Sequence, residues 1–262
     1  MLRIYTYHEL ILASKNEPLN PDYVASRRSA EQDREWSGAD SFESALSLAS
    51  HGWKESKQLF NYTNKFTQTD FYTNYDVSGS MVDVDRFVSG EPENMIDFVS
   101  GVKPKQVIDV KICGGFSAGV DKSIVFKRGE LLLGMIDALE SNGHQVDLSI
   151  IIPCFARGRS KRYDMFTQVI LKNAGYSLNR DIVAFAVCHP AFFRRIVFAV
   201  WESDKAIMKH YLSRTRGGYG RMIETYNEAS DIFIPAIRHG QTEKDCLIQT
   251  EQALAKYGVQ YV

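Results

Sequence analysis

Three consecutive segments decide the fold that this sequence predicts: the apolar run Val107-Ile-Asp-Val-Lys-Ile112, the amphipathic segment from Lys127 to Gly143, and the apolar run Val146-Asp-Leu-Ser-Ile-Ile-Ile152. The small-residue turn Cys113-Gly-Gly-Phe-Ser-Ala-Gly119 follows the first run. Gly143 stands where a left-handed helix cap belongs. One face of the predicted helix carries Leu132, Met135, Ile136 and Leu139. Two strands joined through such a helix form a βαβ unit, which commits the strands to a parallel sheet.

The chain downstream continues this pattern. We expect a helix after Pro153 that carries Met165, Phe166, Val169 and Ile170 and ends at Gly175, then a buried strand over Ile182–Val187. A helix after Pro190, a strand over Asp231–Ala236 and a closing helix from Thr242 to Gly258 complete the alternation. The predicted fold is therefore α/β, a doubly wound, mainly parallel sheet that is Rossmann-like or von Willebrand A-like.

Residues 1–104 differ from this alternation and predict an N-terminal α+β extension packed on a core domain of residues 105–262. Met1 to Leu12 fits a strand or a helix, and Ser41 to Ser50 predicts a short helix. The aromatic stretch from Phe60 to Tyr75 favours extended chain. It fits a stacking platform for unpaired bases or the half-buried face of a β-hairpin, and the hairpin is the favoured interpretation.

Composition bounds the function. The 262 residues are 44% hydrophobic and 24% charged, with a formal charge of -1, as in an ordinary globular protein. No apolar run approaches the ~20 residues that span a bilayer, and the N-terminus lacks a signal-peptide pattern. The four cysteines show no CxxC spacing, so we expect reduced thiols and a cytoplasmic protein, in the host cytoplasm if it is viral.

The motif Asp76-Val-Ser-Gly-Ser80 suggests a metal site. Asp76, Ser78 and Ser80 have the spacing of the metal-ion-dependent adhesion motif, in which a carboxylate and two hydroxyls bind Mg²⁺. The residues before it are too polar for a buried parallel strand, and Gly90 and Pro92 interrupt the helix that should follow. The alternative is a Ser/Gly loop without metal.

Cysteine and histidine residues close several predicted strands, at Cys113, Cys154, Cys188-His189 and Arg238-His239. They would fit a zinc site or a Cys–His nucleophile pair, or else small buried strand ends. Their spacing is not of the metal type. The sequence contains neither GxGxxG nor GxxxxGK[ST], so no nucleotide cofactor is expected.

Two basic loops indicate nucleic-acid binding more strongly than the preceding motifs indicate a metal site or a nucleophile. Guanidinium groups neutralise phosphates, and an adjacent aromatic ring can stack on an unpaired base. The alternatives are solvated surface loops or a site for an acidic protein. The candidate nucleic-acid-binding residues are Phe155, Arg157, Arg159, Lys161, Arg162 and Tyr163 in the first loop, and Arg214, Arg216, Tyr219 and Arg221 in the second.

Three segments carry a family resemblance: Ser41-Phe-x-x-Ala-Leu-x-Leu-Ala-x-x-Gly-Trp53, Val82-Asp-Val-x-Arg-Phe-x-x-Gly-Glu-Pro-Glu-x-Met95, and Arg128-Gly-x-x-Leu132 through Leu139-Glu-x-x-Gly-x-x-Val-Asp-Leu148. Together they resemble a family of poorly characterised phage and plasmid proteins. The central unit is similar to von Willebrand A-like folds, with Ile112 to Ser117 at the position of the metal-binding strand end, where the motif's Asp is missing. In size and general character the chain also resembles the single-stranded DNA-binding transcription factor of podophages that package their own RNA polymerase.

The expected function is therefore a non-enzymatic factor that binds single-stranded DNA and recruits a polymerase or another protein, and the resemblance implies a phage origin. The alternative is a von Willebrand A-like interaction module that uses Mg²⁺ at Asp76, Ser78 and Ser80. A Cys/His enzyme is a third possibility. No membrane association and no further cofactor are expected.

Overall fold

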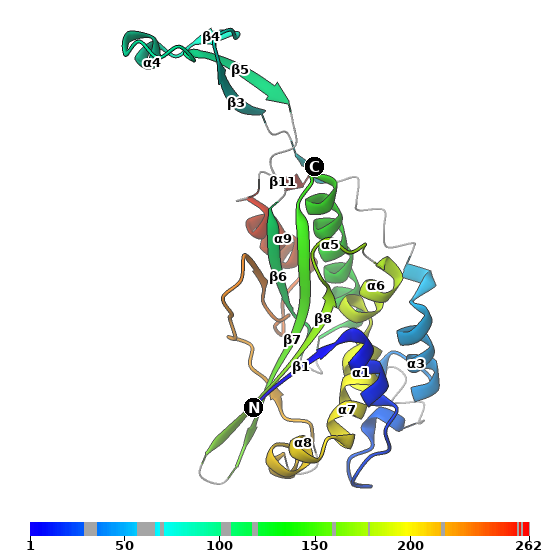
Figure 1. Ribbon diagram of the computed structural model, residues 1–262. Coiled ribbons are helices and arrows are strands. Elements are labelled where there is room, and N and C mark those ends of the chain that lie inside the picture. The colour runs from blue at the N-terminus through cyan, green and yellow to red at the C-terminus, as the bar shows by residue number, and fades with distance from the viewer. Residues whose placement is uncertain are drawn as a thin grey trace.

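The computed structural model describes residues 1–28, 36–56, 66–68, 71–100, 106–116, 120–158, 161–177, 179–215, 218–255, 257 and 259–261. Its main sheet has six strands (Figure 1). Five follow the order β1-β8-β7-β6-β10, and β9 pairs with β7. The strands are β1 (Leu2–Thr6), β6 (Val107–Cys113), β7 (Gln145–Arg157), β8 (Arg162–Lys172), β9 (Arg221–Met222) and β10 (Ile232–Ile234).

The predicted α/β class is confirmed. β6 pairs in parallel with β7 and β10, and β1 pairs in parallel with β8. The helix α5 (Lys122–Ser141) joins β6 to β7, so the predicted βαβ unit is present. β8 and β9 run antiparallel to β7. Because the β6 pairing ends at Ile151, β9 can pair with β7 beyond it, at Cys154 and Phe155.

Two predicted elements were wrong. The segment predicted as a helix around Met165 is strand β8, in which burial alternates through Met165, Thr167 and Val169 with the period of a strand. The segment predicted as a buried strand is helix α6 (Arg180–Cys188), which the Asn179 side chain caps by accepting from the Ile182 amide at 3.2 Å. Since α6 is buried from Val183 to Cys188, it lacks the polar face that marks most helices.

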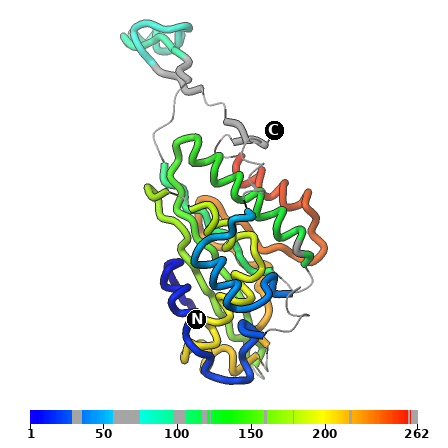
Figure 2. The backbone as a smooth tube through the Cα atoms, turned by 90° about the vertical axis from the view of Figure 1, so that its right-hand side faces the viewer, coloured from blue at the N-terminus to red at the C-terminus, as the bar shows by residue number. Residues whose placement is uncertain are grey.

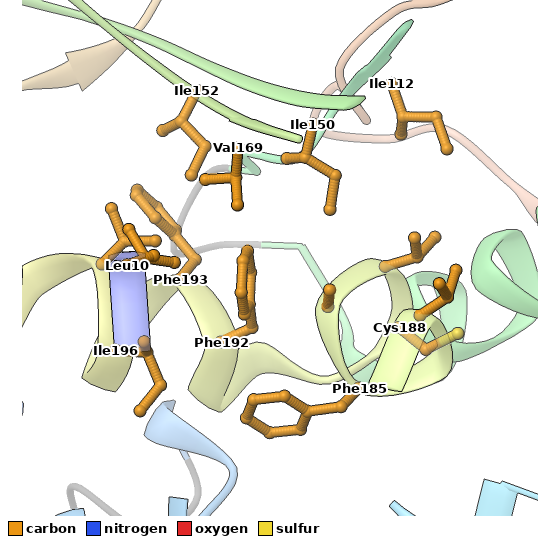
Figure 3. Packing of buried hydrophobic residues seen from close by; sticks show 14 of the residues in the cluster. Leu10, Ile112, Ile150, Ile152, Val169, Phe185, Cys188, Phe192, Phe193 and Ile196 are labelled. Carbon is orange, nitrogen blue, oxygen red and sulfur yellow. The ribbon is translucent and has the colours of Figure 1, made fainter. Parts of the chain in front are cut away.

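Helices cover the sheet and form one continuous core with it. Figure 3 shows Ile150, Ile152 and Val169 of the sheet directed towards Phe192 and Phe193. The helices are α1 (Tyr7–Ser14), α3 (Phe42–His51), α6, the π-helix η3 (Phe192–Val197), α7 (Phe198–Ser203), α8 (Lys205–His210) and α9 (Glu243–Ala255), with short 3₁₀ turns η1 (Ala25–Arg27) and η4 (Leu212–Arg214). No single helix in the described ranges has the length and apolar character to cross a membrane. Taken together, the bent pair Arg180–Cys188 and Phe192–Ser203 has the length and composition of such a helix.

The segment predicted as an N-terminal extension contributes β1 to the main sheet. The Met1 amino group also donates to the Asp164 carbonyl at 2.7 Å. A separate three-stranded antiparallel sheet is built from β3 (Phe71–Asp76), β4 (Met81–Val82) and β5 (Met95–Ser100), with the short helix α4 (Val84–Val88). It stands away from the main sheet in Figures 1 and 2. β2 (Phe66–Gln68) pairs with β11 (Val259–Tyr261), so the described part of the aromatic stretch is extended, as predicted.

Candidate nucleic-acid interface

Both predicted basic loops lie at one end of β7. The β7–β8 hairpin places Arg157 opposite Arg162, and the Gly158 amide donates to the Lys161 carbonyl at 2.9 Å. On the other side of β7, Phe155 lies opposite Arg221 of β9. Chain segments more than 50 residues apart in sequence therefore meet around one strand end.

A basic pocket of about 430 Å³ lies between these segments. Its cationic lining comes from Arg157, Arg214 and Arg221, and Phe155 contributes an aromatic wall. The three arginines are exposed, and none forms an ion pair with a residue that the structure describes. Their charge is therefore available to an anionic ligand.

Gly220 permits the second basic loop to lie close to β7. Its φ of +85° lies in the left-handed region, and a Cβ there would meet the Tyr211 Oη at 1.9 Å and the Phe155 carbonyl at 2.7 Å. The Tyr211 hydroxyl instead donates to the Tyr219 carbonyl at 3.2 Å. The second basic loop is thus fixed against β7 by a position that only glycine fits.

The other predicted residues of the first loop are partly engaged with one another. The guanidinium of Arg162 lies 4.4 Å from the centre of the Phe155 ring and bonds Asp164 at 2.5 Å, so part of its charge is neutralised. Lys161 and Arg214 lie 4.9 and 5.4 Å from the ring centre of Tyr163. Arg159 and Arg216 lie outside the described residues.

Tyr219 is held inside the fold. Its ring stacks on Phe198 with centroids 3.9 Å apart, and its hydroxyl donates to Glu202 and accepts from the Ala25 amide at 3.1 Å. Burial raises the pKa of both Tyr219 and Glu202. One face of this ring is already covered, so Tyr219 positions the loop and is less free to stack on a base than predicted.

A second, apolar cavity of about 650 Å³ adjoins the basic pocket and shares Phe155 and Arg221 with it. Sequence reasoning did not single out its buried charged residue, Arg194 of η3. The guanidinium lies 4.6 Å from the Trp36 ring centre and 4.8 Å from that of Phe116. Burial lowers the pKa of Arg194 to about 10, so it remains a cation at neutral pH. The sequence does contain an indication of a buried cation, since two consecutive arginines interrupt the apolar run Phe192-Phe-Arg-Arg-Ile-Val197.

The metal motif does not lie at the end of a main-sheet strand. Asp76 ends β3 in the small sheet, and Ser78 and Ser80 follow it in an exposed turn. The amide and hydroxyl of Ser80 donate to Asp97, and the Asp76 carboxylate accepts from the Val77 amide at 2.6 Å. Within the described residues, no three His, Cys, Asp or Glu side chains are grouped to hold a metal ion. Magnesium binding stays a prediction.

The cysteines and His189 are enclosed in the core. Cys188 is the last residue of helix α6 and His189 caps that helix, so neither lies at the end of a strand, contrary to expectation. Burial raises the pKa of Cys113 to about 11 and raises those of Cys154 and Cys188 as well, which disfavours the thiolate that a nucleophile requires. His189 packs against the ring of Trp53 at 5.0 Å, and burial lowers its pKa to about 4.

Comparison with known proteins gives a family without an assigned function. The family model described as "Domain of unknown function (DUF7192)" matches residues 6–261. The chain belongs to this family. No curated protein and no solved structure matches it. For this DUF7192 member, the resemblances to phage and plasmid proteins and to von Willebrand A-like folds stay predictions.

Proposed function

We propose that this protein is a non-enzymatic factor that binds single-stranded nucleic acid at the basic pocket. One observation carries the proposal: Arg157, Arg214 and Arg221 come from separate chain segments and surround a single pocket without carboxylate partners among the described residues. Guanidinium groups form paired hydrogen bonds with phosphate oxygens, so three of them around one pocket suit the phosphates of a backbone. The formal charge of the whole chain is only -1, so this positive charge is local.

The neighbouring apolar cavity supports a single strand over a duplex. Phe155 lines both the basic pocket and the cavity, so a strand held by its phosphates would have its bases beside aromatic walls. A duplex keeps its bases stacked and paired and cannot offer them to such walls. Recruitment of a phage RNA polymerase or another protein to the bound strand stays a prediction from the resemblance.

The test is fluorescence anisotropy of a labelled 20-nucleotide dT strand, titrated over a range of salt concentrations, with a duplex of equal length in parallel. We expect tighter binding of the single strand and a steep loss of affinity with salt. Replacing Arg157, Arg214 and Arg221 together with Gln should reduce the slope of log K against log salt by about 2, since each phosphate contact contributes ~0.7 for a single strand.

A matched variant carries Lys54→Gln, Arg238→Gln and Lys244→Gln, which removes the same charge from exposed positions outside the pocket. It should leave most of the slope in place. Equal losses in the two variants, or no binding at low salt, would overturn the proposal. The magnesium alternative predicts instead that EDTA, or Ala at Asp76, Ser78 and Ser80, abolishes binding of a protein partner.

A further inference from the structure

The apolar cavity beside the basic pocket has the features of a site for one base. We propose that it binds a single unstacked guanine of the strand, an inference that rests on the proposed function. Its volume of about 650 Å³ lies in the range of small-molecule sites. Aromatic rings from separated parts of the chain line it, contributed by Trp36, Phe116, Phe155, Phe193, Phe198 and Tyr219.

The two hollows are continuous at the residues they share, Phe155, Gly218, Gly220 and Arg221. A nucleotide whose phosphate lies against Arg221 can therefore direct its base into the cavity without crossing the protein surface. Aromatic walls bind any base by its faces, so they supply affinity but no choice among bases. The choice depends on the polar groups of the cavity.

Arg194 is the first of these polar groups. It is only 6% exposed, and its Nη1 donates to the Trp36 carbonyl, while its Nη2 has no hydrogen-bond partner in the described part of the chain. A buried cationic donor without a partner is unfavourable, and an acceptor on a ligand would satisfy it. Guanine presents two such acceptors, O6 and N7, on one edge, whereas adenine places an amino group where guanine has O6.

Glu224 is the second polar group. It lines the same cavity, is exposed, and forms no ion pair with a described residue. Its carboxylate can accept hydrogen bonds from the N1–H and the N2 amino group of guanine. A donor from Arg194 and an acceptor from Glu224 thus match the opposite hydrogen-bonding groups of one guanine. Hypoxanthine lacks the N2 amino group and would lose part of this match.

The experiment compares 20-nucleotide dT strands in which one central position is dT, dG, dA or deoxyinosine. For the natural chain we expect the dG strand to bind about 5- to 150-fold more tightly than the dA strand, the discrimination of a good bidentate contact, with deoxyinosine between them. Because no strand carries more than one guanine, a strand cannot fold into a guanine quadruplex. The ratio of dissociation constants within each variant cancels a general loss of affinity.

The variants Arg194→Met and Glu224→Gln should reduce the preference for dG over dA to about twofold or less. Glu224 is exposed, so that variant keeps the inference testable even if Arg194→Met does not fold. Glu243→Gln, an exposed change in α9, is the matched control and should keep the preference. A chain that binds dT strands but does not distinguish dG from dA overturns this inference alone. A chain that binds no strand overturns the proposed function itself.

Discussion

The guanidinium carbon of Arg162 lies 4.4 Å from the centre of the Phe155 ring, and the same ring lines both the basic pocket and the apolar cavity. Arg162 is in turn held by Asp164 at 2.5 Å. A guanidinium on an aromatic ring fixes the orientation of both groups. Phe155 is therefore positioned at the junction where a strand would pass from its phosphates to its bases.

Replacing the Phe155 ring tests the contribution of base stacking to affinity separately from that of the phosphate contacts. We expect Phe155→Leu to weaken binding of a dT strand by roughly 5- to 150-fold, because base–aromatic stacking contributes about 1–3 kcal/mol. The slope of log K against log salt should not change, since no phosphate contact is lost. Phe87→Leu, on an exposed ring in α4, is the control. Unchanged affinity in the Phe155 variant would show that its ring does not contact bases.

Arg128 joins two neighbouring strands of the main sheet. Both of its η nitrogens donate to the Cys113 carbonyl at 3.2 Å, and Nη2 also donates to the Pro235 carbonyl at 2.6 Å. Arg128→Met should lower the free energy of unfolding by about 2–4 kcal/mol, because two buried carbonyls lose a charged donor. Urea denaturation measures this, with the exposed Arg238→Met expected within about 0.5 kcal/mol of the natural chain. Similar urea midpoints for the two variants would contradict a stabilising role for the Arg128 hydrogen bonds.

Gly129 lies inside α5 where an added Cβ would stand 2.1 Å from the Cys188 sulfur and 2.9 Å from the Cys188 Cα. Gly129→Ala should destabilise the protein by about 1–3 kcal/mol through overpacking, although alanine favours a helix by ~1 kcal/mol over glycine. Adding Cys188→Ala should recover part of the loss, because it removes the nearest atom. Thermal denaturation of the two single variants and the double variant gives the coupling free energy between positions 129 and 188. Strict additivity would show that α5 and α6 are not in close contact there.

His189 makes stability depend on pH. Its pKa is lowered to about 4 by burial, whereas an unfolded histidine titrates near 6.5. Between these values the unfolded chain binds a proton that the native chain does not, so the unfolding free energy falls as the pH falls, by up to about 3 kcal/mol. His189→Gln should remove this part of the pH dependence. Urea titrations at pH 7, 5.5 and 4 measure it, and parallel curves for the two proteins would refute the assignment.

The central unit was predictable because its signals agree. Helix α5 carries apolar residues at helical spacing, a glycine follows its C-terminal end, and strands β6 and β7 each contain an apolar run. The misassignments have opposite causes. In β8, Phe166 and Ile170 on one side of the strand and Met165 and Val169 on the other together imitate helical spacing. In α6 the run Ile182-Val-Ala-Phe-Ala-Val-Cys188 is apolar without interruption and short, so it cannot be distinguished from a buried strand by its pattern.

The candidate site could be predicted only in part. The residue types in the two basic loops are visible in the sequence, but their convergence depends on β8 and β9 pairing with opposite sides of β7. Because β8 was expected to be a helix, Arg157 and Arg162 could not be placed opposite each other. The role of Tyr219 was also hidden, since its partners Phe198, Glu202 and Ala25 lie far away in the chain.

The pairing of β1 with β8 sets an order on the folding of the chain during its synthesis. Leu2 lies opposite Phe166 and Thr6 opposite Ile170, and β8 ends at Lys172. At about 5–20 residues per second the ribosome makes that partner roughly 10 to 30 s after β1. The nascent chain therefore carries an unpaired β1 until β8 has been made, with α1 beginning directly behind β1 at Tyr7. The β1 edge of the main sheet can therefore form only after β8 has been made, much later than β1 itself.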